Sequence, residues 1–293
     1  MTISPTGIQY ELRDGEYSAV VTEVGAALRS LKWGGDELLW TFEADENPKG
    51  FAGVTLGPWP NRLRDGKFFF DGEEYQAPIN EVEINNALHG LMCATPYALV
   101  HRSPNEVTLK GMLYPQIGWD WVLSLEMSYQ LSDEGLQVSF LATNEGTKDL
   151  PYGYGTHPYF GFENVDDVTI TAPFTKRCAV DERLLPTAIV DVEGVHSRHV
   201  PTTIGDTFLD DAYTGAEGGA WTLTMAAPER TVTMWADEQL PWCQMHTRPG
   251  RVALAVEPMT CGPDAFNEGP THDGLIRLAP GESTTGTWGV SVG

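Results

Sequence analysis

Hydrophobic and polar residues alternate along most of the chain, which predicts β-strands with one buried face. Every second residue is apolar from 123 to 131, and the alternation resumes from 136 to 142. The turn residues Ser-Asp-Glu-Gly at 132–135 separate the two segments. We therefore expect an antiparallel hairpin in which Met127 and Phe140 lie on the same face.

The same alternation recurs and predicts an all-β protein. Further hairpins are expected at 68–70 with 73–75, at 221–225 with 232–236 and at 27–33 with 37–40, and a last strand at 282–292. Helical spacing is nearly absent, with at most a turn or two near 264–267 or 209–213. We expect a large antiparallel β-sandwich with very little helix. No linker, compositional shift or repeat marks a boundary, so residues 1–293 are expected to form a single domain.

The charge balance limits the kinds of partner. Lys and Arg number 18 against 41 Asp and Glu, a net charge of −23 that is spread along the chain. This disfavours nucleic acid and anionic membranes as partners and, more weakly, phosphorylated substrates. No basic segment followed by an apolar core opens the chain, and no apolar run has the length of a membrane span, which predicts a cytoplasmic protein. The four cysteines lack C-x-x-C spacing and are expected to be free, mostly buried thiols.

The stretch LPYGYGTHPYF at 150–160 is the first candidate for chemistry. Tyrosines and glycines surround His157, which lies between Thr156 and Pro158. We expect a loop on stiff backbone that holds an imidazole, titratable near neutral pH, in an aromatic wall. The alternative is a histidine that only closes a β-sandwich.

Glu257 is the second candidate. Residues 251–256 have the composition of a buried strand, and the glutamate follows at its end. A carboxylate in that place is desolvated, which raises its pKa toward that of a useful base. Pro258 is expected to end the strand. The alternative is a glutamate that points into water.

Three other stretches combine polar groups with glycine, proline or aromatic residues. They are 57–62 with Asn61 and Arg62, 85–90 with His89, and 208–213 with Asp210. A guanidinium beside an aromatic wall suits hydroxyl-rich or carboxylate ligands. The alternatives are a surface salt bridge for the arginine, a core histidine, and a cap of a short helix for the aspartate. No pair of histidines has metal-ligand spacing and no nucleotide-binding motif occurs, so neither ligand is expected.

Taken together, these stretches resemble the aldose 1-epimerase (galactose mutarotase-like) family. The resemblance rests on motifs that occur in the family's order: Asn61-Arg62-Leu63 with Gly66-Lys67-Phe68 and Asp71-Gly72, Asn86-Ala87-Leu88-His89-Gly90, Thr156-His157-Pro158-Tyr159-Phe160, Leu209-Asp210-Asp211-Ala212-Tyr213, and Glu257-Pro258-Met259-Thr260. It implies a β-supersandwich whose open cleft binds a free monosaccharide and needs no cofactor. It also implies that ionised Glu257 is the general base and protonated His157 the general acid. Asn61, Arg62, His89 and Asp210 would hold the sugar.

Two departures leave the substrate open. The galactose enzymes usually have Gly-Arg before the Asn-x-Arg motif and a second glycine after His-Gly, where this chain has Gly-Pro-Trp-Pro at 57–60 and Leu91. Glucose, galactose, a deoxy sugar and a sulfonated hexose are all candidates. The Trp-Pro element resembles the hexose-6-phosphate epimerase branch, although the motifs show no basic residues to clamp a phosphate. The chain does not reveal its oligomeric state.

A carbohydrate-binding protein without turnover is the competing class of function. Several aromatic residues could supply stacking faces for sugar rings: Trp59, Trp119, Trp121, Trp242, Tyr159 and Tyr213. The presence of both Glu257 and His157 favours an enzyme.

Overall fold

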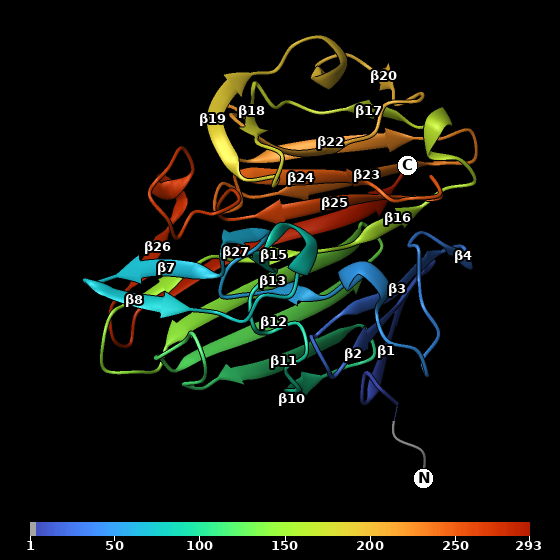
Figure 1. Ribbon diagram of the computed structural model, residues 1–293. Coiled ribbons are helices and arrows are strands. Elements are labelled where there is room, and N and C mark those ends of the chain that lie inside the picture. The colour runs from blue at the N-terminus through green and yellow to red at the C-terminus, as the bar shows by residue number, and fades with distance from the viewer. Residues whose placement is uncertain (1–3) are drawn as a thin grey trace.

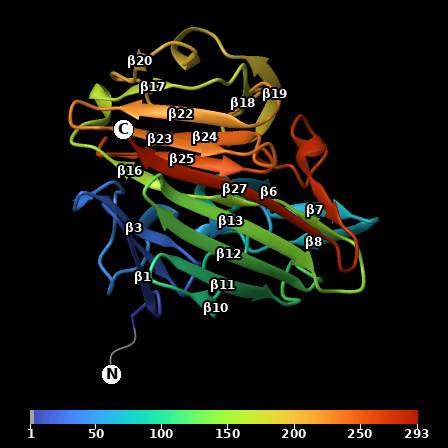
Figure 2. The same ribbon diagram turned by 180° about the vertical axis from the view of Figure 1, so that it is seen from behind.

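The computed structural model describes residues 4–293, and strand is the main regular structure of these residues, with five single-turn 3₁₀ helices and no α-helix. Two large antiparallel sheets dominate the molecule. Figure 2 shows the nine-stranded sheet, from β10 at its lower edge to β22 and β17 near the top. In spatial order its strands are β10 (Tyr97–Arg102), β11 (Glu106–Leu113), β12 (Leu123–Ser132), β13 (Gly135–Asn144), β27 (Ser283–Val292), β23 (Thr231–Ala236), β22 (Trp221–Ala226), β17 (Thr169–Thr171) and β20 (Thr202–Thr203).

The eight-stranded sheet carries the candidate site, and β24 and β25 are seen near its middle in Figure 1. Its strands in order are β19 (Pro186–Asp191), β18 (Lys176–Val180), β21 (Asp210–Thr214), β24 (Trp242–Thr247), β25 (Ala253–Met259), β15 (Gly155–Thr156) and β5 (Thr55–Leu56), and β16 (Tyr159–Gly161) also pairs with β25. All seven residues of β25 are buried. A polar residue on this strand is therefore desolvated wherever it lies.

Smaller sheets complete the fold. They are β1 (Gln9–Asp14), β2 (Tyr17–Thr22), β3 (Leu28–Trp33) and β4 (Asp36–Glu37) in one sheet, and the pairs β14 (Leu150–Tyr152) with β26 (Ile276–Leu278), β6 (Arg62–Arg64) with β9 (Asn86–Leu88), and β7 (Lys67–Phe70) with β8 (Glu73–Gln76). The 3₁₀ helices are η1 (Lys49–Phe51), η2 (Val82–Ile84), η3 (Val165–Asp167), η4 (Gly194–His196) and η5 (His272–Gly274).

The predicted hairpins are present. In β12 and β13, Met127 lies opposite Phe140, and both side chains are buried on the same face. β7 pairs with β8 and β22 with β23, as expected from the alternation. The all-β antiparallel prediction is therefore confirmed. One buried apolar cluster includes residues from Tyr10 to Val290, so side chains from both ends of the chain meet in the same core.

Two short helical turns that the sequence allowed do not form, and one expected strand is shorter than predicted. Residues 210–214 form strand β21, so Asp210 does not cap a helix, because pairing with β24 fixes this segment in extended form. Residues 264–267 form a turn without a helix. The segment expected at 37–40 forms a strand only over Asp36–Glu37.

Two other expectations concern membranes and thiols. No helix within residues 4–293 combines the length and the apolar character that crossing a bilayer requires. All four cysteines are free, and Cys178, Cys243 and Cys261 are buried, in agreement with the sequence prediction.

Candidate active site

Strand register brings His157 and Glu257 together. β15 and β16 both pair with β25, with Gly155 opposite Met259 and Tyr159 opposite Ala255. The same antiparallel register puts His157 opposite Glu257, at the interruption between β15 and β16. Side chains at opposed positions of neighbouring strands lie on one face of the sheet.

This register corrects two expectations. The stretch 150–160 is not a loop, because it forms the short strands β14, β15 and β16. Glu257 does not follow a strand but lies inside β25, which continues through Pro258 to Met259. Val256 donates its backbone N–H to the Pro158 carbonyl across the interruption.

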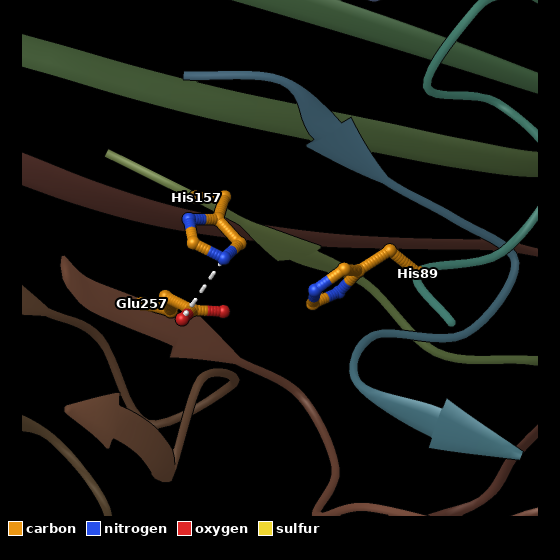
Figure 3. A group of neighbouring side chains, drawn as sticks. All are labelled: His89, His157 and Glu257. Carbon is orange, nitrogen blue, oxygen red and sulfur yellow. Dashed lines mark ion pairs between the residues drawn. The ribbon is translucent and has the colours of Figure 1, made fainter. Parts of the chain in front are cut away.

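The His157 imidazole and the Glu257 carboxylate are in contact and shielded from water. Nε2 of His157 lies 3.3 Å from Oε1 of Glu257, as Figure 3 shows. The two residues are 5% and 1% exposed. Within residues 4–293, Oε2 of Glu257 and Nδ1 of His157 find no hydrogen-bond partner. Buried polar atoms are normally paired, so an unpaired carboxylate oxygen in a pocket is a candidate contact for a ligand.

Burial opposes charge on both members of this pair. It raises the pKa of the Glu257 carboxyl well above its ordinary value; the Asp210 charge adds to the rise and Arg62 partly offsets it. Burial also lowers the pKa of His157 to about 3, assisted by His246. The pair therefore holds one proton over a wide pH range. Burial favours that proton on the carboxyl, whereas the sequence interpretation expected an ionised glutamate and a protonated histidine.

His89 faces the pair from a tight turn. Its backbone N–H donates to the Asn61 carbonyl at 2.9 Å, and the Asn61 N–H donates back to Nδ1 of His89 at 3.2 Å. Because Nδ1 accepts, the proton of the neutral ring is on Nε2, which makes that nitrogen a donor. Burial keeps the ring neutral by lowering its pKa, with His157 adding to the effect.

Backbone geometry fixes this turn. Asn61 and His89 are in the left-handed region, with φ of 55° and 63°. At Gly90 a Cβ would lie 2.1 Å from the Gly57 carbonyl oxygen, so only glycine permits the two segments to approach here. The Asn61 amide is also engaged: Oδ1 accepts from the Arg62 N–H at 2.8 Å and Nδ2 donates to Gln244 at 3.3 Å.

Arg62 is held by a carboxylate that the sequence interpretation missed. Nε and Nη2 of Arg62 both donate to Glu81, at distances of 2.9–3.2 Å. The two side chains are 12% and 17% exposed, so this is a partly buried pair rather than a surface salt bridge. Within residues 4–293, Nη1 of Arg62 makes no side-chain hydrogen bond to Glu81 or to another residue. The contact between Glu81 and Arg62 could not be predicted from their spacing in the chain, because it depends on the pairing of β6 with β9.

We expect Glu81→Gln to weaken substrate binding through Arg62. Arg62→Ala should raise KM roughly 10- to 100-fold, the range for a hydrogen bond to a charged group. Glu81→Gln should raise it less, because the arginine stays but is no longer held in place. In the Arg62→Ala background, Glu81→Gln should have no further effect. Steady-state kinetics of the single and double variants test this, and an equal effect of Glu81→Gln in both backgrounds would contradict it.

Residues that lie opposite one another on neighbouring strands form rows across the sheet, and two such rows supply the remaining residues of the site. Gln244 lies opposite Glu257, and the next row on the same face contains Tyr159, Ala255, His246 and Asp210. Gln244 Nε2 donates to Asp210 at 2.7 Å, and Nδ1 of His246 lies 3.5 Å from the same oxygen. Burial alone would raise the pKa of Asp210, but these contacts and the Arg62 charge hold it below its ordinary value. Asp210 is therefore an ionised acceptor. Gln244 and His246 were missed because nothing in a strand sequence reveals its neighbours.

All six predicted residues line one pocket of about 220 Å³. The lining consists of Gly50, Phe51, Asn61, Arg62, Leu88, His89, His157, Tyr159, Asp210, Gln244, His246 and Glu257. A concave pocket of this size with polar side chains in its lining suits one small polar ligand.

The tryptophans proposed for stacking do not contribute to this pocket. Trp59, Trp119, Trp121 and Trp242 are buried elsewhere, as is Tyr213, and Tyr159 is the member of that group in the lining. Phe51 adds a second aromatic surface, 4.7 Å from the His89 ring. The wide aromatic platform typical of a binding module is therefore not formed by these residues.

His89, His157 and Glu257 also offer the donor types that zinc binds. Their ligand atoms lie within 4.8 Å of one another. A tetrahedral site with bonds of about 2.1 Å needs ligands roughly 3.4 Å apart, which is tighter than this spread. The short contact between His157 and Glu257 suits sharing of a proton. A site without metal or cofactor stays a prediction.

Comparisons with known proteins agree with this arrangement. The chain is 33% identical over 270 residues to YihR, an uncharacterized protein of Escherichia coli strain K12, covering 90% of this chain and 87% of that protein. It is 28% identical over 156 residues to the galactose mutarotase of Rattus norvegicus, covering 49% and 44%. A solved structure of a putative aldose 1-epimerase from Escherichia coli K12 superposes with a TM-score of 0.84 at 22% identity, over 98% of this chain and 99% of that one.

A family model decides the assignment. The model described as aldose 1-epimerase matches residues 9–291. That range contains every residue of the pocket and every strand named above except the last residue of β27, Val292. The chain therefore belongs to the aldose 1-epimerase family.

Proposed function

We propose that the protein interconverts the α and β anomers of a free hexose by opening and closing its hemiacetal ring. The observation that supports this most is the buried contact between His157 and Glu257, 3.3 Å apart, in a pocket sized for one small polar ligand. One group takes the proton of the C1 hydroxyl while the other gives a proton to the ring oxygen as the C1–O5 bond breaks. After rotation about C1–C2, the same two proton transfers run in reverse, and the ring closes on the opposite face of the aldehyde.

The pair can begin this cycle with a single proton. The forms with the proton on Glu257 and on His157 contain the same number of protons, so binding of a polar sugar can shift it between them without exchange with water. We assign the base to Glu257 and the acid to His157 in the direction that opens the ring. His89 Nε2–H, Arg62 Nη1 and the ionised Asp210 would hold the hydroxyls, and their fixed positions orient the ring.

We expect the pH profile of kcat/KM to be bell-shaped with an acid limb near pH 3. On the acid side activity falls when the pair takes a second proton, and the pKa of His157 is about 3. On the alkaline side, activity falls when His157 and Glu257 lose the one proton that they share. Burial raises the pKa of Glu257 and so moves this loss to higher pH. An ordinary glutamate base, with a pKa of about 4.3, would already lose more than half of the activity at pH 4.

Initial rates of mutarotation, corrected for the spontaneous rate, test this expectation. Circular dichroism at each pH shows whether the chain is still folded. An acid limb centred above pH 4 in folded protein would contradict it.

A polarimeter separates this proposal from carbohydrate binding without turnover. A catalyst speeds the approach of freshly dissolved α-glucose or α-galactose to its equilibrium rotation, and a binding protein does not. Sugar binding without any acceleration, tested over glucose, galactose, 6-deoxy and anionic hexoses, would refute the proposed function.

A further inference from the structure

Arg248 extends the pocket-lining face of β24 beyond the strand end. Gln244 and His246 both line the pocket, and because side chains alternate along extended backbone, Arg248 follows on the same face. A Cβ at the pocket residue Gly50 would lie 3.1 Å from Nη1 of Arg248. The guanidinium carbon is 5.7 Å from the ring centre of Tyr159, another pocket residue. The guanidinium therefore lies at the pocket rim.

The guanidinium is held in position by an aromatic ring. Its carbon lies 3.6 Å from the ring centre of Trp40, with Tyr159 on another side. Stacking uses the face of the guanidinium and leaves the N–H groups at its edge free to donate. Trp40 thus limits the motion of Arg248 without neutralising it.

The charge of Arg248 is not balanced by an ion pair. Six other arginines pair with carboxylates: Arg62, Arg64, Arg177, Arg183, Arg251 and Arg277. Within residues 4–293 no carboxylate lies within ion-pair distance of Arg248. Other arginines among residues 4–293 also lack a carboxylate partner, so what distinguishes Arg248 is its place at the rim of the pocket. A neutral hexose would offer Arg248 only hydroxyls, whereas an anionic group would accept two N–H hydrogen bonds from the edge of the guanidinium.

We propose that Arg248 receives an anionic group carried by C6 of the hexose substrate. The inference rests on the proposed function, which places C1 and the ring oxygen beside His157 and Glu257. Arg248 lies two residues beyond the pocket residue His246, just past the end of β24, and its guanidinium borders Gly50 and Tyr159 of the lining, so it can reach an exocyclic substituent of a bound sugar. The exocyclic C6 group is the part of a hexopyranose that carries an anion without loss of a ring hydroxyl. Carboxylate, phosphate and sulfonate share this chemistry.

This subsite changes one sequence expectation. The motifs show no basic residues that would clamp an anion, because Arg248 lies outside all of them. It reaches the pocket only through the pairing of β24 with β25 and the stacking on Trp40.

The test compares anionic and neutral hexoses in the same protein. Wild-type kcat/KM for mutarotation is measured on glucose, glucuronate, glucose 6-phosphate and 6-deoxy-6-sulfoglucose. We expect at least one anionic hexose to exceed glucose. Arg248→Met, which keeps a long side chain over Trp40, should lower the ratio of anionic to neutral kcat/KM roughly 10- to 100-fold, and Arg248→Lys should restore part of it.

Arg230→Met is the matched control. Arg230 also lies over an aromatic ring, 5.9 Å from the centre of Phe162, but it donates to the Gly161 carbonyl and does not line the pocket. Its replacement should leave the ratio unchanged. A ratio that is the same in wild type and Arg248→Met would overturn the inference, whatever the overall rate.

Binding to locked anomers keeps the subsite testable if no sugar is turned over. Methyl glycosides of glucuronate, glucose 6-phosphate and 6-sulfoglucose cannot mutarotate, so calorimetry measures affinity alone. Tighter binding of one of them than of methyl glucoside, lost in Arg248→Met, supports the subsite even where the proposed catalysis fails. No preference for any anionic glycoside refutes the subsite and leaves the proposed catalysis to polarimetry.

Discussion

Glu257→Gln is expected to lower kcat for mutarotation by about 10²- to 10⁴-fold, because proton transfer by a positioned group contributes on this order. The amide keeps the size of the side chain but cannot accept a proton from the C1 hydroxyl. KM should change little, since Arg62, His89 and Asp210 still line the pocket. The ratio of kcat values, measured polarimetrically at saturating sugar, gives the effect directly.

Stability measurements test whether Glu257→Gln loses activity only because it unfolds. Burial disfavours the charged form of Glu257, as the raised pKa shows, so a neutral amide at this position should not lower the melting temperature. The exposed turn residue Glu134 provides the matched control, and Glu134→Gln should leave both kcat and stability unchanged. Near-native kcat in a folded Glu257→Gln protein would remove Glu257 from the mechanism.

His157→Asn is expected to reduce kcat by a similar factor, because the amide cannot give a proton to the ring oxygen. Since His157 and Glu257 share one proton in direct contact, the two act as a unit and their effects should not add. The double variant Glu257→Gln/His157→Asn should therefore be only slightly slower than either single variant. Independent groups would instead multiply their losses.

The control for this series is His101→Asn. His101 is exposed on β10, and its Nε2 lies 4.0 Å from Oε2 of Glu106. We expect His101→Asn to have the kcat of the wild type. Fully multiplicative losses in the double variant, with intact circular dichroism, would show that His157 and Glu257 act separately.

Period-two alternation was sufficient to predict the fold class, because one-sided burial repeats in almost every hairpin. Met127 and Phe140 illustrate this. Each lies on the same face of the sheet as the apolar residues two positions away, and the turn between the two strands sets the register that places them opposite each other. Alternation says nothing about β25, whose residues are buried on both faces. For that reason the sequence placed Glu257 at a strand end.

The candidate site was predictable only as a set of residue types. His157, Glu257, Arg62, His89, Asp210 and Asn61 were all found, and the structure brings them to one pocket. Glu81, Gln244, His246 and Arg248 were not, since each reaches the site through pairing between strands distant in the chain. Local composition encodes which residues are unusual, whereas sheet topology determines which of them become neighbours.

The left-handed backbone at Asn61 and His89 also affects the stability of the whole protein. Both residues have a Cβ. The conformation costs on the order of 1 kcal/mol at His89 and less at Asn61, because asparagine adopts it more readily. The sum is appreciable beside the 5–15 kcal/mol by which an ordinary domain is stable. Glycine would remove this cost at either position, together with the side chain that faces the pocket. At these two residues, thermodynamic stability and the capacity to bind a ligand are in opposition.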